Sequence, residues 1–221
     1  SLIDKTYLTN INFGEDTTRI SEFYYSLDRL HQQDSTIMSG PLIKGLLDIQ
    51  KLQAVETISL NINQYIDNNP KDIRSYLILG DLYFNKGDFL NAISYYYKAN
   101  LINESVIDSR LYLGISLFFI NEYADAINEL NKVIILDKYN SLAKYYIGLS
   151  YFNLKDYNLS VENLTNALLL NYYSDDIYYY LGLAYKKLNE NMQAMEAFKQ
   201  ATHINHNNGL AHFELGNIYE S

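Results

Sequence analysis

The side chains best suited to metal or acid–base chemistry lie near the C-terminal end of this sequence. Three histidines, His203, His206 and His212, lie close together, and imidazole nitrogens are common ligands of zinc. No cysteine or carboxylate joins them at ligand spacing, so we interpret them as polar residues at a helix end and in the turn that follows. We therefore expect neither a metal site nor a cofactor.

The adjacent carboxylates Asp175 and Asp176 are the strongest candidates for a general acid and base. Both stand where a helix is expected to begin, and acidic side chains there are favoured by the helix dipole and the free backbone N–H groups. We interpret the pair as helix-capping. The sequence also has no cysteine, no glycine-rich phosphate loop and no His-Glu-x-x-His motif, so we expect no enzyme activity.

The charge balance disfavours two classes of partner. The formal net charge is −9, and no stripe of lysine and arginine is visible, so phosphate backbones and anionic membrane surfaces are repelled. No apolar run approaches the roughly 20 residues that a membrane-spanning helix needs. We expect a protein partner rather than nucleic acid, and no membrane span in this chain.

The compartment stays open at this stage. Abundant Asn, Ile, Lys and Tyr indicate an AT-rich, bacterial genome, and the absence of cysteine fits the bacterial cytoplasm and the periplasm alike. The chain begins at Ser1 rather than at a methionine, so a lost initiator and a missing upstream segment that attaches it to a membrane are both open. Whether Ser1 and Ser221 are native ends is open too.

The elements that position these side chains follow a 34-residue period. Five glycines mark it: Gly80, Gly114, Gly148, Gly182 and Gly216. A small residue stands twelve positions after each of the first four: Ala92, Ala126, Ser160 and Ala194. A glycine inside a helix costs about 1 kcal/mol relative to alanine, so we interpret the glycines as places where a paired helix approaches closely, with the small residue opposite.

This pattern resembles the tetratricopeptide repeat, a helix–turn–helix unit of 34 residues. The resemblance covers 73–206 as four full repeats and 209–221 as the first helix of a fifth. It implies an all-α fold, an α-solenoid in which antiparallel helix pairs form a right-handed superhelix. The usual proline at the repeat end is absent, and these residues replace it: Glu104, Lys138, Tyr172 and His206.

The sequence upstream of Ile73 fits the repeat less well. Pro70 is in register for a preceding repeat, but Gly45 is one place out, so we expect a degenerate helix pair there. An amphipathic helix over 18–33 then forms an N-terminal helical cap or hairpin. The predicted domains are 1–38, the degenerate pair 39–72, the repeats 73–106, 107–140, 141–174 and 175–208, and the capping helix 209–221.

Members of the family usually bind partners in the concave groove formed by the first helix of each pair. The resemblance places sixteen residues in or beside that groove: Leu77, Phe84, Asn85, Leu111, Tyr112, Ile115, Phe118, Phe119, Tyr145, Tyr146, Leu149, Phe152, Asn153, Tyr179, Leu183 and Phe213. Most are apolar or aromatic. Chaperone adaptors of this family grip a C-terminal carboxylate with Lys, Arg and Asn at such positions, and this sequence has Leu, Tyr and Ile there instead.

We therefore predict a non-enzymatic interaction scaffold or stabilising subunit, chaperone-like in that it holds an apolar helix or extended segment of another protein. Two alternatives stay open. The chain could self-assemble into a homo-oligomer through the groove and the helix 18–33, or that helix could occupy the groove itself. It could also be a regulatory or targeting segment of a larger protein. The sequence does not identify the partner or the pathway.

Overall fold

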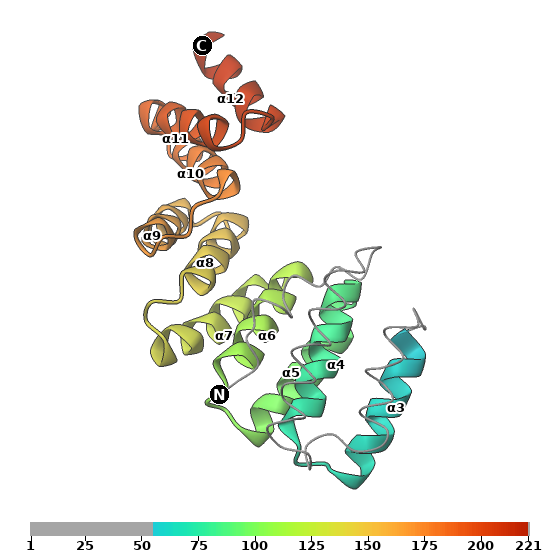
Figure 1. The fold of residues 1–221 in the computed structure, drawn as a ribbon. Coiled ribbons are helices and arrows are strands. Elements are labelled where there is room, and N and C mark those ends of the chain that lie inside the picture. The colour runs from blue at the N-terminus through green and yellow to red at the C-terminus, as the bar shows by residue number, and fades with distance from the viewer. Residues whose placement is uncertain (1–54, 221) are drawn as a thin grey trace. The chain divides into compact units, whose positions relative to one another are not determined.

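The computed structural model describes residues 55–220, and every element in that range is a helix. The predicted helix 18–33, and the part of the degenerate pair that precedes Val55, lie outside the described residues. The chain divides into two compact units, Ser1–Ser109 and Arg110–Ser221. The described helices are α3 Val55–Asn68, α4 Ile73–Lys86, α5 Phe89–Ile102, α6 Ile107–Phe119, α7 Tyr123–Leu136, α8 Ser141–Asn153, α9 Tyr157–Leu169, α10 Asp175–Lys187, α11 Asn191–Ile204 and α12 Gly209–Glu220 (Figure 1).

The helices begin at the interval that the glycines indicate. Successive first helices start 34 residues apart, at Ile73, Ile107, Ser141, Asp175 and Gly209. Successive second helices keep the same interval, at Phe89, Tyr123, Tyr157 and Asn191. Figure 1 shows α4 beside α5 in the first unit, and α8 beside α9 and α10 beside α11 in the second. The all-α solenoid class is therefore confirmed, whereas the domain boundaries as drawn stay a prediction.

The turn inside each pair is the same in both units. One residue in each turn adopts a left-handed backbone: Gly87, Asn121, Lys155 or Asn189. In the first turn the N–H of Gly87 donates to the carbonyl oxygen of Phe84 and that of Asp88 to the carbonyl oxygen of Tyr83, both at 2.9 Å. The same pair of bonds closes the other three turns. These bonds satisfy carbonyl groups at the end of each first helix and reverse the chain.

Side chains in the turns also start several of the helices. Asp88 and Asp156 follow the left-handed residue, and each carboxylate accepts a hydrogen bond from the backbone N–H three residues on. Asn140 and Ser174 cap α8 and α10 in the same way. Such caps satisfy N–H groups that have no partner within the helix. The polar residues between the apolar runs thus set where each helix begins.

The repeating glycines lie against large side chains of the second helix in their pair. A Cβ added to Gly80 would lie 2.5 Å from the ring of Tyr96, and one added to Gly148 would lie 2.7 Å from Cγ of Leu164. Gly114 meets Leu130 and Gly182 meets Phe198 in the same way. Close approach therefore explains these glycines, as predicted.

The nearest neighbour of each glycine differs from the one that the sequence indicates. The small residues, Ala92 among them, are fully buried, but the atoms closest to the glycine belong mainly to the side chain four residues further on. That side chain lies one helical turn away on the same face. The small residue lets the two backbones approach, and the glycine makes room for a ring or an isobutyl group.

Each unit has its own apolar core. In the first unit α3 packs on α4, and Ile62, Leu79 and Tyr96 are almost completely buried. In the second unit one cluster centres on Leu164, Ile177 and Leu181, and another on Ala194, Phe198, Ala201 and Ala211. Side chains of α12 complete the last cluster. Burial of these apolar side chains is the main stabilising term in such a stack.

The glycine contacts predict opposite effects for one substitution at two repeat positions. Gly148→Ala brings a methyl group to 2.7 Å from the Leu164 side chain and to 3.0 Å from its backbone nitrogen. We expect the free energy of unfolding to fall by about 1–3 kcal/mol. Gly216→Ala meets no described atom within 4 Å, so the better helix propensity of alanine should raise it by up to about 1 kcal/mol. Urea unfolding followed by circular dichroism measures both, and a stabilising Gly148→Ala would refute the close packing.

Candidate functional site

Three predicted groove residues lie in the first unit, on α4. Leu77, Phe84 and Asn85 are all half-buried. The ring of Phe84 meets that of Phe89 edge-on, with centroids 5.5 Å apart. The amide Nδ2 of Asn85 donates to the carbonyl oxygen of Asp81 at 2.8 Å, so part of its hydrogen-bonding capacity is used within its own helix.

The second unit contains a larger aromatic surface. Phe119, Phe118, Tyr146 and Tyr145 follow one another in edge-to-face contacts, and Tyr145 then stacks on Tyr172 with centroids 4.8 Å apart. These residues come from α6, α8 and the loop after α9. Edge-to-face rings attract one another beyond the area they bury, so the contacts hold the rings in fixed orientations.

A second series links α8, α10 and α11. Phe152 meets Tyr180 at 5.5 Å, Tyr180 meets Tyr179 at 5.6 Å, and Tyr179 meets Phe198 at 5.9 Å. Phe152 also meets Tyr157 of α9 at 5.6 Å. The rings thus form two connected groups along the first helices of the second unit. We call these rings, from Phe118 to Tyr180, the aromatic surface.

Equivalent residues make the contact between successive first helices. Phe118 meets Tyr146, and Phe152 meets Tyr180 one repeat later, both nearly at right angles. One repeat further on, the same two positions hold Lys186 and Glu214, which form an ion pair. The aromatic surface therefore ends where charged side chains replace the rings.

Four of the predicted groove residues are buried in the seams between helices. Leu111, Ile115, Tyr145 and Leu149 are each at most 7% exposed. Tyr145 and Leu149 belong to the core cluster around Leu164. These four side chains support the surface from beneath, and a partner would meet only what lies above them.

The remaining predicted residues reach solvent to different extents. Phe119 is 44% exposed and Phe213 is 66% exposed, and Asn153 is also exposed. The amide of Asn153 donates to the carbonyl oxygen of Leu149, as Asn85 does one turn back in its helix. The half-buried ones are Tyr112, Phe118, Tyr146, Phe152, Tyr179 and Leu183. Their role as partner contacts stays a prediction.

The tyrosines of this surface are held in the neutral form. Burial, with smaller effects of Tyr172 and the Asp176 carboxylate, raises the pKa of Tyr146 to about 12. Burial also raises the pKa values of Tyr145, Tyr172 and Tyr180, and Asp176 adds to each shift. At neutral pH these phenols therefore present apolar rings with hydroxyl groups that can donate hydrogen bonds.

The histidines do not assemble a metal site. His206 Nδ1 lies 2.9 Å from the carbonyl oxygen of Thr202, and His212 Nε2 lies 3.1 Å from that of His206. No group of three or more metal-ligating side chains occurs within the described range 55–220. Asp175 accepts hydrogen bonds from Asn205 and Asn208, which attaches the loop before α12 to α10.

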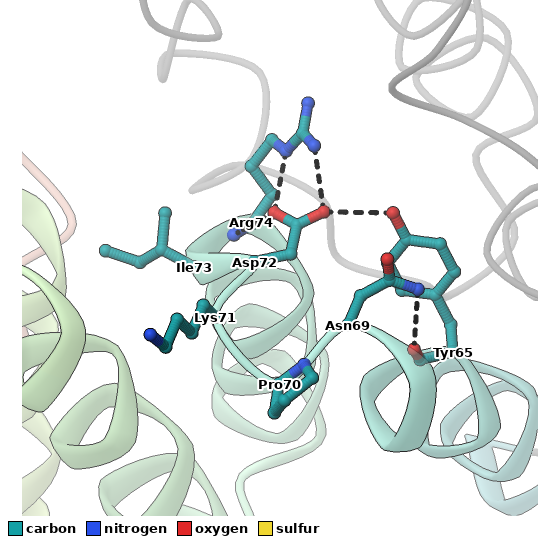
Figure 2. A pocket seen from close by; sticks show the side chains of 7 residues that line it. All are labelled: Tyr65, Asn69, Pro70, Lys71, Asp72, Ile73 and Arg74. Carbon is teal, nitrogen blue, oxygen red and sulfur yellow. Dashed lines mark hydrogen bonds and ion pairs between the residues drawn. The ribbon is translucent and has the colours of Figure 1, made fainter.

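A shallow pocket of about 570 Å³ lies between the end of α3 and the start of α4 in the first unit. Figure 2 shows the seven side chains that line it, with Arg74, Asp72 and Tyr65 joined by hydrogen bonds. Asp72 accepts bonds from Arg74 Nε and Nη2 at 2.8 Å and from the Tyr65 hydroxyl at 3.1 Å. It also accepts from the backbone N–H of Arg74, as the N-cap of α4.

This network has a structural role. Burial alone would raise the pKa of the Asp72 carboxyl, but the hydrogen bonds and positive charge of Arg74 hold it below its usual range. The carboxylate is thus stabilised by four donors and connects α3 to α4. We assign the pocket no ligand.

One set of surface residues escaped the sequence analysis. Several large apolar side chains near the ends of the second helices are strongly exposed, such as Ile135 at 82% and Leu169 at 75%. Tyr139 and Tyr173, in the loops that follow, are exposed by about two thirds. Ile135 and Leu169 stand 34 residues apart, as do Tyr139 and Tyr173, so an apolar residue repeated at a solvent-facing position was the available signal.

The helix pairs and their exposed aromatic surface define a helical repeat scaffold. The tetratricopeptide repeat family model matches residues 73–105 and 175–208. A solved structure described as MamA protein is 31% identical over 67% of this chain and 81% of its own, with a TM-score of 0.62. This chain belongs to the tetratricopeptide repeat family.

Two further solved structures share the fold. MamA from Desulfovibrio magneticus RS-1 is 16% identical over 78% of this chain and 99% of its own, with a TM-score of 0.69. YrrB, described as a TPR protein with an unusual peptide-binding site, is 15% identical over 85% of this chain and 96% of its own, with a TM-score of 0.68. A comparison with curated proteins gave no match.

The family is one of protein–protein interaction scaffolds, typically without enzyme activity, and the chain is assigned to that class. Within residues 55–220, none of the helices combines the length and the apolar character that crossing a membrane requires.

The Asp72 network predicts a pH-dependent loss of stability. Asp72→Ala removes both the cap of α4 and the acceptor for Arg74 and Tyr65, which should lower the free energy of unfolding by about 1–2 kcal/mol at pH 7. Because the folded pKa of Asp72 is depressed, its stabilisation is present above about pH 4 and is lost as the pH falls further. The difference from wild type should therefore narrow in acid. Urea unfolding across pH measures it, with exposed Asp67→Ala as the control; a difference that is constant across pH would contradict this account.

Proposed function

We propose that this chain is a non-enzymatic scaffold that binds an apolar or amphipathic segment of a partner protein on the aromatic surface of its second unit. The observation that carries the proposal is the connected series of rings on successive first helices. Aromatic side chains whose orientation is already fixed lose little conformational entropy on binding, so they are effective anchors for a partner.

The exposure of the rings supports this proposal. Phe119 keeps 44% of its surface exposed although it contacts both Phe118 and Tyr146. Phe118, Tyr146 and Phe152 are half-buried beside it on α6 and α8. A surface that is rigid, partly exposed and apolar is typical of a site that a partner completes.

The polar groups near the rings limit what the segment can be. The exposed side chain of Asn153 and the neutral phenols can hydrogen-bond to a peptide backbone or to polar side chains on one face of a helix. The repeat with rings at these positions gives way to the Lys186–Glu214 pair one repeat later. We therefore propose an occupant with an apolar face that lies over α6 and α8. The printed description of YrrB as having a peptide-binding site is consistent with a peptide as ligand.

Peptide selection followed by surface variants tests this proposal. Random 16-residue peptides displayed on phage are selected on the wild-type protein, and binding of the synthetic winners is measured by fluorescence anisotropy. We expect selected peptides to be rich in apolar residues. The double variant Phe119→Ser, Tyr146→Ser should bind them at least about tenfold more weakly, because two anchors are lost.

The control variant is Leu169→Ser, which removes a large apolar side chain that is 75% exposed on the second helix α9. It should bind the peptides as the wild type does. Both variants need the helical circular dichroism signal of the wild type. If the double variant binds normally, or if the control loses binding instead, the aromatic surface is not the site.

A further inference from the structure

We propose that the aromatic surface includes a receptor for one arginine side chain of the partner, formed by the carboxylate of Asp176 and the rings of Tyr146, Tyr172 and Tyr180. This inference rests on the proposed function, because it specifies one side chain of the segment bound there. Neither the sequence motif nor the groove positions expected from the family pointed to Asp176 as a ligand-binding residue.

The packing of α8 against α10 brings these groups together. Tyr145 forms the floor: it is buried, it stacks on Tyr172 at 4.8 Å, and it meets Tyr146 at 5.2 Å. Tyr146, Tyr172 and Tyr180 pack around the same core cluster and remain half-buried. Three rings are therefore fixed with part of each surface open to solvent.

Asp176 lies among these rings. It precedes Ile177, which is buried in the same core cluster as Tyr145, and it stands one helical turn before Tyr180 on α10. Its negative charge acts on Tyr145, Tyr146, Tyr172 and Tyr180 alike. Side chains from α8, from α10 and from the loop that follows α9 thus surround one carboxylate.

This carboxylate has no protein counter-ion. Among residues 55–220, no side chain forms an ion pair or a hydrogen bond with Asp176. Although more than a third of Asp176 is exposed, the surrounding rings remove part of its water, and that burial together with Asp175 raises its pKa. A cation placed beside it would relieve both effects.

Arginine matches this chemistry better than the other cationic side chain. A guanidinium group is flat, stacks on aromatic faces and can donate two hydrogen bonds to a carboxylate. A lysine ammonium group is more strongly hydrated and would satisfy the carboxylate without using the ring faces as fully. The net charge of −9 also attracts a basic segment toward the protein.

A single-residue probe separates this inference from the proposed function. N-acetyl-arginine methylamide and its neutral isostere, N-acetyl-citrulline methylamide, are titrated against the wild-type protein by ligand-observed NMR. Neither contains an apolar segment, so neither depends on the rest of the aromatic surface. We expect saturable binding of the arginine probe, at least about tenfold weaker binding of the citrulline probe, and weakening of arginine binding by added salt.

The variant Asp176→Asn should reduce binding of the arginine probe about tenfold, because the counter-charge is removed at constant size. The matched control is Asp125→Asn, which makes the same charge change at an exposed carboxylate in the first turn of α7, and it should bind as the wild type does. Equal binding of arginine and citrulline by the wild type, or normal arginine binding by Asp176→Asn, overturns the proposal. Arginine binding that survives a failed peptide selection would support the receptor and reject only the longer segment.

Discussion

The fit of a glycine against one large side chain of its paired helix is the constraint on which the rest of the structure depends. Tyr96, Leu130, Leu164 and Phe198 fill the space that a Cβ would otherwise occupy. Because this contact fixes how closely the two helices of a pair approach, it also fixes how the first helices of successive pairs meet. The aromatic contacts between Phe118 and Tyr146 and between Phe152 and Tyr180 follow from that arrangement.

The same rings contribute to stability and to the proposed binding. Tyr145 is fully enclosed and belongs to the core, whereas Phe119 is its distant neighbour in the same series and is largely exposed. A partner on this surface would therefore bind side chains whose positions are already set by the core. Such a surface changes little on binding, which reduces the entropic cost of association.

Much of the fold follows from the sequence, because the period is written in residues that have few alternatives. A glycine at Gly80, Gly114, Gly148 and Gly182 indicates a close helix crossing, and each pair of helices begins where that period places it. The surface is harder to predict. Leu111 and Phe119 are both apolar and both stand on α6, yet one is 6% and the other 44% exposed, because adjacent helices cover only one of them. Asp176 was assigned to capping because its neighbours, Tyr146 and Tyr172, come from other elements and residue spacing does not reveal them.

A crystal structure of the protein with a selected peptide tests the central claim most directly. The account predicts that the apolar side chains of the peptide lie against Phe119 and Tyr146, over the first helices of the second unit. A peptide seated instead on the exposed residues near the ends of the second helices, at Ile135 and Leu169, would contradict it.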